Sequence, residues 1–359
     1  MPESHRFAAG HLHSIARRMF TSAGTPRHIA DDVAEILVDA NLTGHDSHGV
    51  LRIPAYLQRI GDGRIDPAAE PQRIKETAST LIVDGGNGFG HYAARVAMQW
   101  AIEKAQQADV CCASLRRTGH IGRLGDYAEQ AARAGCIGLI TAGTATRGEG
   151  LTAPFGGIKG ALGTNPIAVG VPTGDGTPFI LDYATSVIAE GKIKVARSTG
   201  ADLPDGVIID KDGHPSVKPA AFYDGGFLLP FGRHKGYALG LVVSLLGGLS
   251  GEYDGERGRM GGAFLQAINI SAFTPLAEYQ RAVRAMLNGV KAAPPAPGVH
   301  EVLAPGDPEH LSRVRRMKEE IALPDSTYQE IREWAQRLRV SLSEDTIEAA
   351  DVERYRLTV

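Results

Sequence analysis

The segment GHDSHG, residues 44–49, holds two histidines, an aspartate and a serine between two glycines. Such a composition suits three kinds of site. His45, Asp46 and His48 could bind a metal ion, Ser47 could attack an acyl group with help from a histidine, or one histidine could act alone as an acid and base. The rest of the sequence has to distinguish these chemistries.

The metal and acyl-transfer hypotheses are weakened by spacing. A catalytic zinc ion needs about three protein ligands held by further partners, and Asp46 lies between the two histidines, where joint ligation is awkward. His120 and His234 are isolated candidates for further ligands, and no second dense cluster occurs. Ser47 lacks the strand–elbow–helix setting of a nucleophilic serine, and an adjacent histidine seldom reaches its neighbour's hydroxyl in line.

The third hypothesis uses His48 and Arg52, which are four residues apart. The positive end of a following helix disfavours a charged imidazole, so His48 would stay neutral and able to accept a proton near pH 7. Arg52 lies one helical turn further on, and its planar guanidinium suits a carboxylate. A capped helix start with a surface arginine explains this pair equally well, so the pair alone does not decide.

Four further polar loops favour a nucleotide-binding enzyme. His120 lies in a glycine-flanked loop, and Thr164 follows a glycine-rich stretch. Asp182 ends a predicted strand, and His234 and Lys235 open an apolar helix whose backbone N–H groups could hold a pyrophosphate. By contrast, the glycines at 86–90 have the spacing G-x-G-x-G, which favours a tight turn over a standard dinucleotide-binding loop.

The elements that must position these loops are mainly helices at both ends and an alternating section between them. Apolar periodicity predicts a helix over residues 26–43, and Pro54 should kink or delay the next one. Strands and helices alternate from residue 78, and the apolar run 235–249 predicts a buried helix. A Pro-rich linker at 292–298 precedes helices at 308–321 and 326–339. We therefore expect a helical lobe at 1–77, a mixed α/β domain at 78–290, and a linker with helices at 291–359 that packs back on the first lobe.

Composition excludes several classes of protein. The chain has 359 residues, 43% of them apolar, and a net charge of −3 without a long block of one sign, which gives no electrostatic reason to expect a nucleic-acid partner. Cys111, Cys112 and Cys136 indicate core residues in a reducing compartment. The longest apolar stretch is shorter than the ~20 residues of a membrane span, and the N-terminus lacks a signal region. We expect a soluble cytoplasmic protein without a membrane partner.

The polar loops together resemble a known family. The stretches GHDSHGVLRIPAY, TGHIGRLGDYAEQAARAG, APFGG, LGTNPIAVGVP, ILDYATSVIAEGK and LLPFGRHKGYAL are similar to those of the type II malate/L-lactate dehydrogenases, which are NAD(P)-dependent oxidoreductases. They occur in family order over nearly the whole chain, and the sequence is most similar to bacterial 2-hydroxycarboxylate dehydrogenases. The resemblance implies an α/β fold with a non-Rossmann mixed-sheet cofactor domain, a helical lobe formed from both chain ends, and a homodimer with active sites near the subunit interface.

The resemblance also implies an activity, the interconversion of a small 2-hydroxy acid and its 2-oxo acid. His48 would donate and accept the proton with Ser47 beside it, and Arg52 would bind the substrate carboxylate. His120 and Thr164 would also contact substrate. The residues implied to contact the cofactor are His120, Ile121, Gly122, Arg123, Leu124, Asp182, Tyr183, Ala184, His234, Lys235, Gly306 and Asp307.

The sequence departs from the family pattern at two places. Arg233 replaces a glycine that many relatives have before HKG, and Lys192 stands where the imine-reducing branch carries an acidic residue. The second departure favours ketone chemistry over reduction of a cyclic imine, although a cyclic imine or a keto sugar acid stays an alternative substrate. A metal-dependent hydrolase or lyase using GHDSHG is the alternative from another class. We expect NAD, with NADP possible through Arg123 or Arg197.

Overall fold

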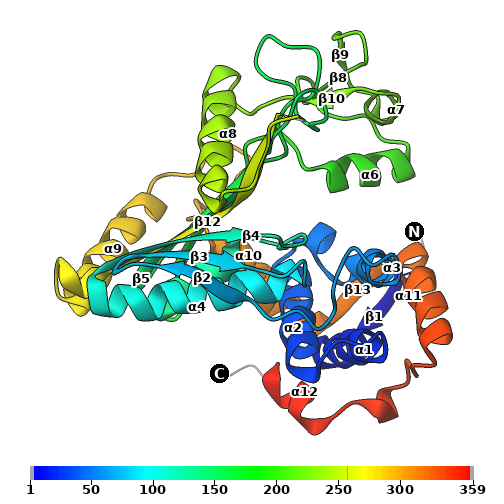
Figure 1. Cartoon of the computed structure of the whole chain (residues 1–359), viewed down its shortest axis with the longest axis horizontal. Coiled ribbons are helices and arrows are strands. Elements are labelled where there is room, and N and C mark those ends of the chain that lie inside the picture. The colour runs from blue at the N-terminus through cyan, green and yellow to red at the C-terminus, as the bar shows by residue number, and fades with distance from the viewer. Residues whose placement is uncertain (1–3, 257, 356–359) are drawn as a thin grey trace.

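The computed structural model describes residues 4–256 and 258–355, and a mixed sheet of eight strands lies at its centre (Figure 1). Seven strands follow the order β2-β3-β4-β12-β5-β6-β7, and β11 pairs with β12. Within this sheet β3 and β4 are parallel, and the other neighbours are antiparallel. The strands are β2 (Gln72–Glu76), β3 (Thr80–Asp84), β4 (Val110–Arg116), β5 (Cys136–Ala145), β6 (Pro166–Val171), β7 (Phe179–Ala184), β11 (Tyr253–Asp254) and β12 (Arg259–Asn269).

Helices pack on both faces of this sheet. On one face lie α4 (Gly90–Ala108), which connects the parallel pair, and α5 (Gly125–Arg133), while α8 (His234–Gly247) lies on the other. A Cβ at Gly138 would lie 2.5 Å from Ala131 of α5, and one at Gly143 would lie 2.6 Å from Val243 of α8. Side chains alternate between the faces along a strand, so these two positions of β5 face opposite sides. The missing side chains allow both helices to approach closely.

The two chain ends form a second body beside the sheet (Figure 1). β1 (Ser4–Phe7) pairs antiparallel with β13 (Ile321–Pro324). Its core joins residues from both ends of the chain, such as Phe20 and Leu37 with Ile321 and Ile331. Its helices are α1 (Ala9–Ser22), α2 (Arg27–Leu42), α3 (Ile53–Gly61), α10 (Asp307–Glu319), α11 (Asp325–Leu338) and α12 (Ala349–Arg354).

A third, small group of helices and short strands lies near the start of α8 (Figure 1). Its core includes Ile193, Ile208, Phe222 and Leu228. Its elements are α6 (Glu190–Thr199), β8 (Ile208–Ile209), β9 (Pro215–Ser216), α7 (Pro219–Tyr223) and β10 (Phe227–Leu228). The remaining helix, α9 (Leu276–Lys291), follows β12.

The structure confirms the helix before GHDSHG and the delayed start of the next helix, because Pro54 lies in the first turn of α3. The expectation of a buried helix at 235–249 is wrong. Val242 and Leu245 of α8 are 47% and 61% exposed, because the sheet covers only the opposite side of the helix. α6 and α9 were not predicted.

Within the described part of the chain, no helix combines the length and the apolar composition that crossing a membrane requires.

Candidate functional site

The segment GHDSHG is a rigid connection between α2 and α3. Residues Asp46–His48 form a short 3-10 turn. The Asn41 side chain donates from Nδ2 to Asp46 Oδ1 at 2.6 Å and accepts from the backbone N–H of Val50 at 2.9 Å. Arg316 of α10 donates to both carboxylate oxygens of Asp46, at 2.5 and 3.0 Å. Asp46 therefore fixes the loop to two helices.

The three possible metal ligands of this loop do not converge. His45 Nε2 lies 3.2 Å from Glu309 Oε1, Asp46 pairs with Arg316, and His48 Nδ1 lies 2.9 Å from Ser47 Oγ. Each group is thus bound to a different partner. The loop gives no support to a metal-dependent hydrolase or lyase.

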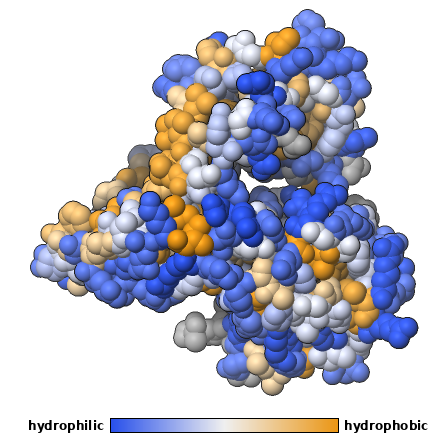
Figure 2. Space-filling model, viewed as in Figure 1, coloured by the Kyte–Doolittle hydropathy of each residue, from blue (hydrophilic) through white to orange (hydrophobic). Residues whose placement is uncertain are grey.

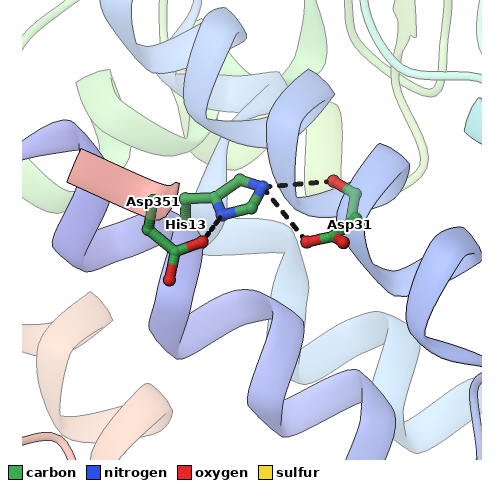
Figure 3. Close-up of side chains that lie close together, drawn as sticks. All are labelled: His13, Asp31 and Asp351. Carbon is green, nitrogen blue, oxygen red and sulfur yellow. Dashed lines mark hydrogen bonds and ion pairs between the residues drawn. The ribbon is translucent and has the colours of Figure 1, made fainter. Parts of the chain in front are cut away.

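Among the described residues, the one group with metal-ligand geometry lies elsewhere, at His13, Asp31 and Asp351 (Figure 3). Figure 3 shows the His13 ring between the two acidic residues. Arg17 donates to both oxygens of Asp351, at 2.7 and 2.9 Å. Because this guanidinium already balances the carboxylate, the cluster is a buried ion pair that ties α12 to α1.

His48 faces a second histidine. The ring centroids of His48 and His120 are 5.5 Å apart and nearly parallel. The Tyr56 hydroxyl lies 2.7 Å from His120 Nδ1 and 3.4 Å from Nε2 of the buried His91. Tyr56 and His91 were missed by the sequence reasoning. Tyr56 lies one helical turn after Arg52, so the helical period could have found it, whereas His91 is brought in from α4 by the tertiary fold.

The surroundings of these histidines keep them neutral. Burial, followed by the nearby charge of Arg52, lowers the pKa of His48 to about 4. Burial also lowers the pKa of His91 to about 3 and that of His120 well below its ordinary value. Near neutral pH each ring therefore has one nitrogen able to accept a proton.

Arg52 immediately precedes α3 and has free hydrogen-bonding capacity. Its Nε donates to the Ser47 carbonyl at 2.7 Å, which aims the guanidinium from the same loop that carries His48. Among the described residues, no carboxylate pairs with Arg52. Its two terminal nitrogens are available to a planar anion.

A cavity of about 820 Å³ opens beside His48. Thr144 and Gly143 of β5 contribute to its wall, and Arg116 and Arg259 lie among its other lining residues. Arg52 and Arg123 are not among them. The predicted site residues that do line it are His48, His120, Ile121, Gly122, Leu124 and Thr164.

Arg123 and Asp182 lie in a buried charge cluster instead. Arg123 is 3% exposed and donates to Asp126 at 2.8 Å. Asp182 accepts the backbone N–H of Gly125 at 2.7 Å and lies 3.7 Å from Arg123 Nε. Burial raises the pKa of Asp126 to about 7 and raises that of Asp182, although Arg123 opposes both shifts. These side chains hold the start of α5 against β7.

The remaining predicted residues lie along β7 and its neighbours. The Thr185 N–H donates to the Thr164 carbonyl at 2.9 Å, and the Phe231 N–H donates to the Thr185 carbonyl at 3.0 Å. These bonds bring Tyr183 and Ala184 next to the exposed start of α8, where His234 and Lys235 lie.

Gly306 and Asp307 lie towards the other end of β7. The Ile180 N–H donates to the Pro305 carbonyl at 3.2 Å. Asp307 pairs with Lys291 at 2.7 Å. The Asp307 side chain is thus already occupied by a protein cation.

The first turn of α6 packs against the GHDSHG loop at Ser47. A Cβ at Gly191 would lie 2.7 Å from Ser47 Cβ, so the first turn of this helix approaches Ser47 at a distance that only glycine permits. The sequence reasoning missed this contact, because residues 47 and 191 meet only in the folded chain.

Comparisons with known proteins agree with one another. A model of the malate/L-lactate dehydrogenase family matches residues 7–332. Hydroxycarboxylate dehydrogenase B of Escherichia coli (strain K12) is 35% identical over 97% of this chain and 98% of its own length. The crystal structure of malate dehydrogenase from Entamoeba histolytica superposes with a TM-score of 0.88 at 27% identity, covering 94% of this chain and 99% of the other. Delta1-piperideine-2-carboxylate reductase from Pseudomonas syringae pvar. tomato superposes with a TM-score of 0.80 at 33% identity, covering 92% and 100%.

Proposed function

This chain belongs to the malate/L-lactate dehydrogenase family and is an oxidoreductase, and we propose that it interconverts a small 2-hydroxy acid and its 2-oxo acid with His48 as the acid and base. One observation carries the proposal. A half-buried, neutral His48 lines a large cavity opposite His120, and the unpaired Arg52 extends from the same loop. A base and a carboxylate-binding group on one rigid loop match the two functional groups of a 2-hydroxy acid.

In this mechanism His48 takes the hydroxyl proton of the substrate during oxidation and returns it during reduction. Its Nδ1 lies 2.9 Å from Ser47 Oγ, so Nε2 is the atom that meets the substrate. When Nδ1 carries the hydrogen and donates to Ser47, Nε2 is free to accept a proton. Accepting the substrate proton at Nε2 converts the ring to an imidazolium, in which Nδ1 keeps its hydrogen bonded to Ser47 Oγ. In reduction the imidazolium returns the Nε2 proton to the substrate oxygen and becomes neutral again, so the same arrangement serves both directions.

Arg52 would bind the substrate carboxylate through its two terminal nitrogens, because Nε is already bonded to the Ser47 carbonyl. A two-point contact fixes the carbon that carries the hydroxyl, and such orientation lowers the barrier by several kcal/mol. His120, oriented by Tyr56, and Thr164 would supply the remaining hydrogen bonds to substrate oxygens.

The residues along β7 fit a nicotinamide dinucleotide. Bound there, the nicotinamide would accept and return the hydride. The exposed start of α8, where the Lys235 ammonium lies beside the positive end of the helix dipole, would suit a pyrophosphate. Ile180, beside Pro305, and Ala184 are four residues apart on one strand, about 13 Å, so contacts at Tyr183, Ala184 and Gly306 would suit an extended ligand.

We propose that this cofactor-binding arrangement is not a Rossmann fold. Within the sheet, a single parallel pair is joined by α4, and the proposed cofactor strand β7 is antiparallel to β6. NAD is favoured over NADP, because Arg123, one of two arginines considered for a 2′-phosphate, is buried and paired. The other, Arg197, stacks on Tyr223 at 4.6 Å.

We propose further that the chain forms a homodimer through α8. Exposed apolar residues recur on one side of this helix and its extension, where Figure 2 shows a hydrophobic strip. Spacings of three to four residues place them on one face. They are Ala238, Val242, Leu245 and Leu249. The exposed Tyr253 continues this face to the cavity wall, which would place the active site near the interface.

A cyclic imine is the second substrate class, supported by the likeness to the piperideine carboxylate reductase. An imine acid also offers Arg52 a carboxylate and His48 a nitrogen to protonate. The test is loss of reduced-nicotinamide absorbance with NADH or NADPH and a panel of 2-oxo acids, a keto sugar acid and one cyclic imine. Turnover of a 2-oxo acid supports the proposal, whereas turnover of the imine alone overturns it in favour of the second class.

A further inference from the structure

A second cavity, of about 280 Å³, lies in the body formed by the chain ends. It opens between the end of α1, the start of α2 and the segment that runs from α11 past α1 to α12 (Figure 1). Its lining contains four arginines, Arg17, Arg18, Arg27 and Arg339, and one carboxylate, Glu348. None of these residues belongs to the cleft described above.

Two of the four arginines are neutralised by protein carboxylates. Arg17 donates to both oxygens of Asp351 and lies 2.9 Å from Glu348. Arg27 pairs with the other oxygen of Glu348. Among the described residues, no carboxylate pairs with Arg18 or Arg339. The cavity wall therefore carries two positive charges without a counter-charge in contact.

The surroundings of Arg18 leave its guanidinium without a carboxylate partner. Its Nε donates to the Ser14 carbonyl at 3.2 Å, and its Nη2 is buried without an acceptor. Burial lowers the pKa of Arg18, and the charge of Arg17 lowers it further. Arg18 is half-buried, and Asp351 and Glu348 raise its pKa from a distance while their carboxylates contact Arg17. A bound anion would supply the direct contact to Arg18 that these carboxylates do not make.

The uncharged groups at the cavity are also donors. The hydroxyl side chains of Thr21, Ser22 and Ser341 line it. α2 begins at Arg27 without a side-chain cap, so its first N–H groups and the positive end of its dipole are open to an anion. Guanidinium, hydroxyl and helix N–H donors together are the groups that bind phosphate in proteins.

We propose that this cavity binds a phosphate group, either inorganic phosphate or the phosphate of a small ester, through Arg18 and Arg339. Two unpaired guanidiniums match the two charges of phosphate near neutral pH. Arg18 belongs to α1, whereas Arg339 and Ser341 belong to the C-terminal part of the chain. A bound phosphate would therefore crosslink the two ends of the chain and stabilise the body that carries GHDSHG.

The test is thermal unfolding of the full chain in inorganic phosphate and in sodium chloride of equal ionic strength, with NAD⁺ present so that phosphate does not occupy the cofactor cleft. We expect phosphate, but not chloride, to raise the melting temperature by several degrees, because a ligand of the native state stabilises it by mass action. Calorimetric titration gives the Kd, and glycerol phosphate tested beside inorganic phosphate shows which source binds more tightly.

The double variant Arg18→Gln, Arg339→Asn should lose the shift, and each single variant should weaken phosphate binding roughly 10-fold, the scale of a charged hydrogen bond. Asn at 339 tolerates the left-handed backbone there, φ 56°. Arg339 is exposed, so its single variant should fold even if the double variant does not. Arg133→Gln, an exposed change on α5, is the control and should keep the full shift. An equal effect of chloride, or a phosphate shift that survives Arg339→Asn unweakened, would overturn the proposal.

Discussion

His48 owes its proposed role to the groups around it rather than to its own type. The chain has 12 histidines, and several have structural roles, such as His13, which hydrogen-bonds to the buried Asp351, and His45, which contacts Glu309. His48 differs because its Nδ1 meets a hydroxyl, its ring lines a cavity, and an unpaired arginine extends from the same loop. Chemistry at this position depends on that combination.

Replacing Arg52 by lysine should raise the KM for the carboxylate substrate and lower kcat/KM about 10- to 100-fold, because a point charge cannot replace two parallel hydrogen bonds. Steady-state kinetics would measure this. Arg59→Lys, an exposed change on α3, is the matched control and should leave the KM unchanged. A normal KM in Arg52→Lys would show that the carboxylate binds elsewhere.

The pH dependence of oxidation should also reflect His48. Oxidation needs the neutral ring, and burial lowers the pKa of His48 to about 4. The ring stays neutral above this value and becomes protonated below it. We therefore expect kcat/KM for the 2-hydroxy acid to stay flat between about pH 5 and pH 8, where an ordinary histidine would titrate near 6.5. A fall centred near pH 6.5 that disappears in a His48 variant would contradict this.

At this scale the sequence was informative about residues that are close in the chain. GHDSHG and Arg52 could be found because their spacing has a local meaning. Tyr56 could have been found from the helical period after Arg52. His91 and Arg316, which help to hold the site together, could not be assigned, because their contacts join residues far apart in the chain. The sequence also could not show that the side chains of Arg123 and Asp182 face each other beneath the cleft.

At the scale of elements, the start of α8 contains an unusual backbone. Arg233 adopts φ 58° and ψ −118°, a region that favours glycine. Its guanidinium lies 5.6 Å from the Phe155 ring centroid, which offsets part of the strain. This conformation turns the chain from the β7 side into the helix that carries His234 and Lys235.

Comparing Arg233→Gly with Arg233→Ala isolates the backbone strain, because both variants lose the contact with Phe155. We expect the glycine variant to be the more stable by about 1 kcal/mol, since the Cβ of alanine is strained at positive φ and glycine has no Cβ. Urea unfolding gives the free energies. Equal stability, or a more stable alanine variant, would show that the loop does not hold this conformation.

Elements with a clear period were predictable, including α2, α3, α10 and α11 of the terminal body and the strands β3 to β7. The exposure of α8 was not predictable. A helix that is apolar on all sides is predicted to be buried, whether its own chain or a second copy of the chain covers it. α6 lacks a strong apolar stripe, and its importance lies in one close contact at Gly191. α9 has an amphipathic pattern that could have identified it.

At the scale of the whole molecule, two bodies built from distant segments would share the proposed site. The terminal body supplies His48 and Arg52, and the sheet supplies His120, Thr164 and β7. α10 stabilises this arrangement, because its Glu309 and Arg316 bind the GHDSHG loop from the C-terminal side. The proposed dimer adds a third component along α8.

The variant Leu245→Lys, Leu249→Lys should convert the dimer to a monomer, because it places two charges at the centre of the apolar face. Light scattering coupled to size exclusion would report the mass. Met286→Lys, at another exposed apolar residue, is the control and should leave the mass unchanged. A dimeric Leu245/Leu249 variant would exclude this face as the interface, and a monomeric parent chain would refute the dimer itself.

The most direct test of the account is the turnover of His48→Ala beside His45→Ala, with cofactor binding measured by fluorescence of the reduced nicotinamide. His45 lies in the same loop but bonds to Glu309, so its variant controls for disturbance of the loop. We predict that His48→Ala binds the cofactor normally and loses about 10²- to 10⁴-fold in kcat, while His45→Ala loses far less. Turnover of His48→Ala equal to that of the parent chain would contradict the assignment of His48 as the acid and base.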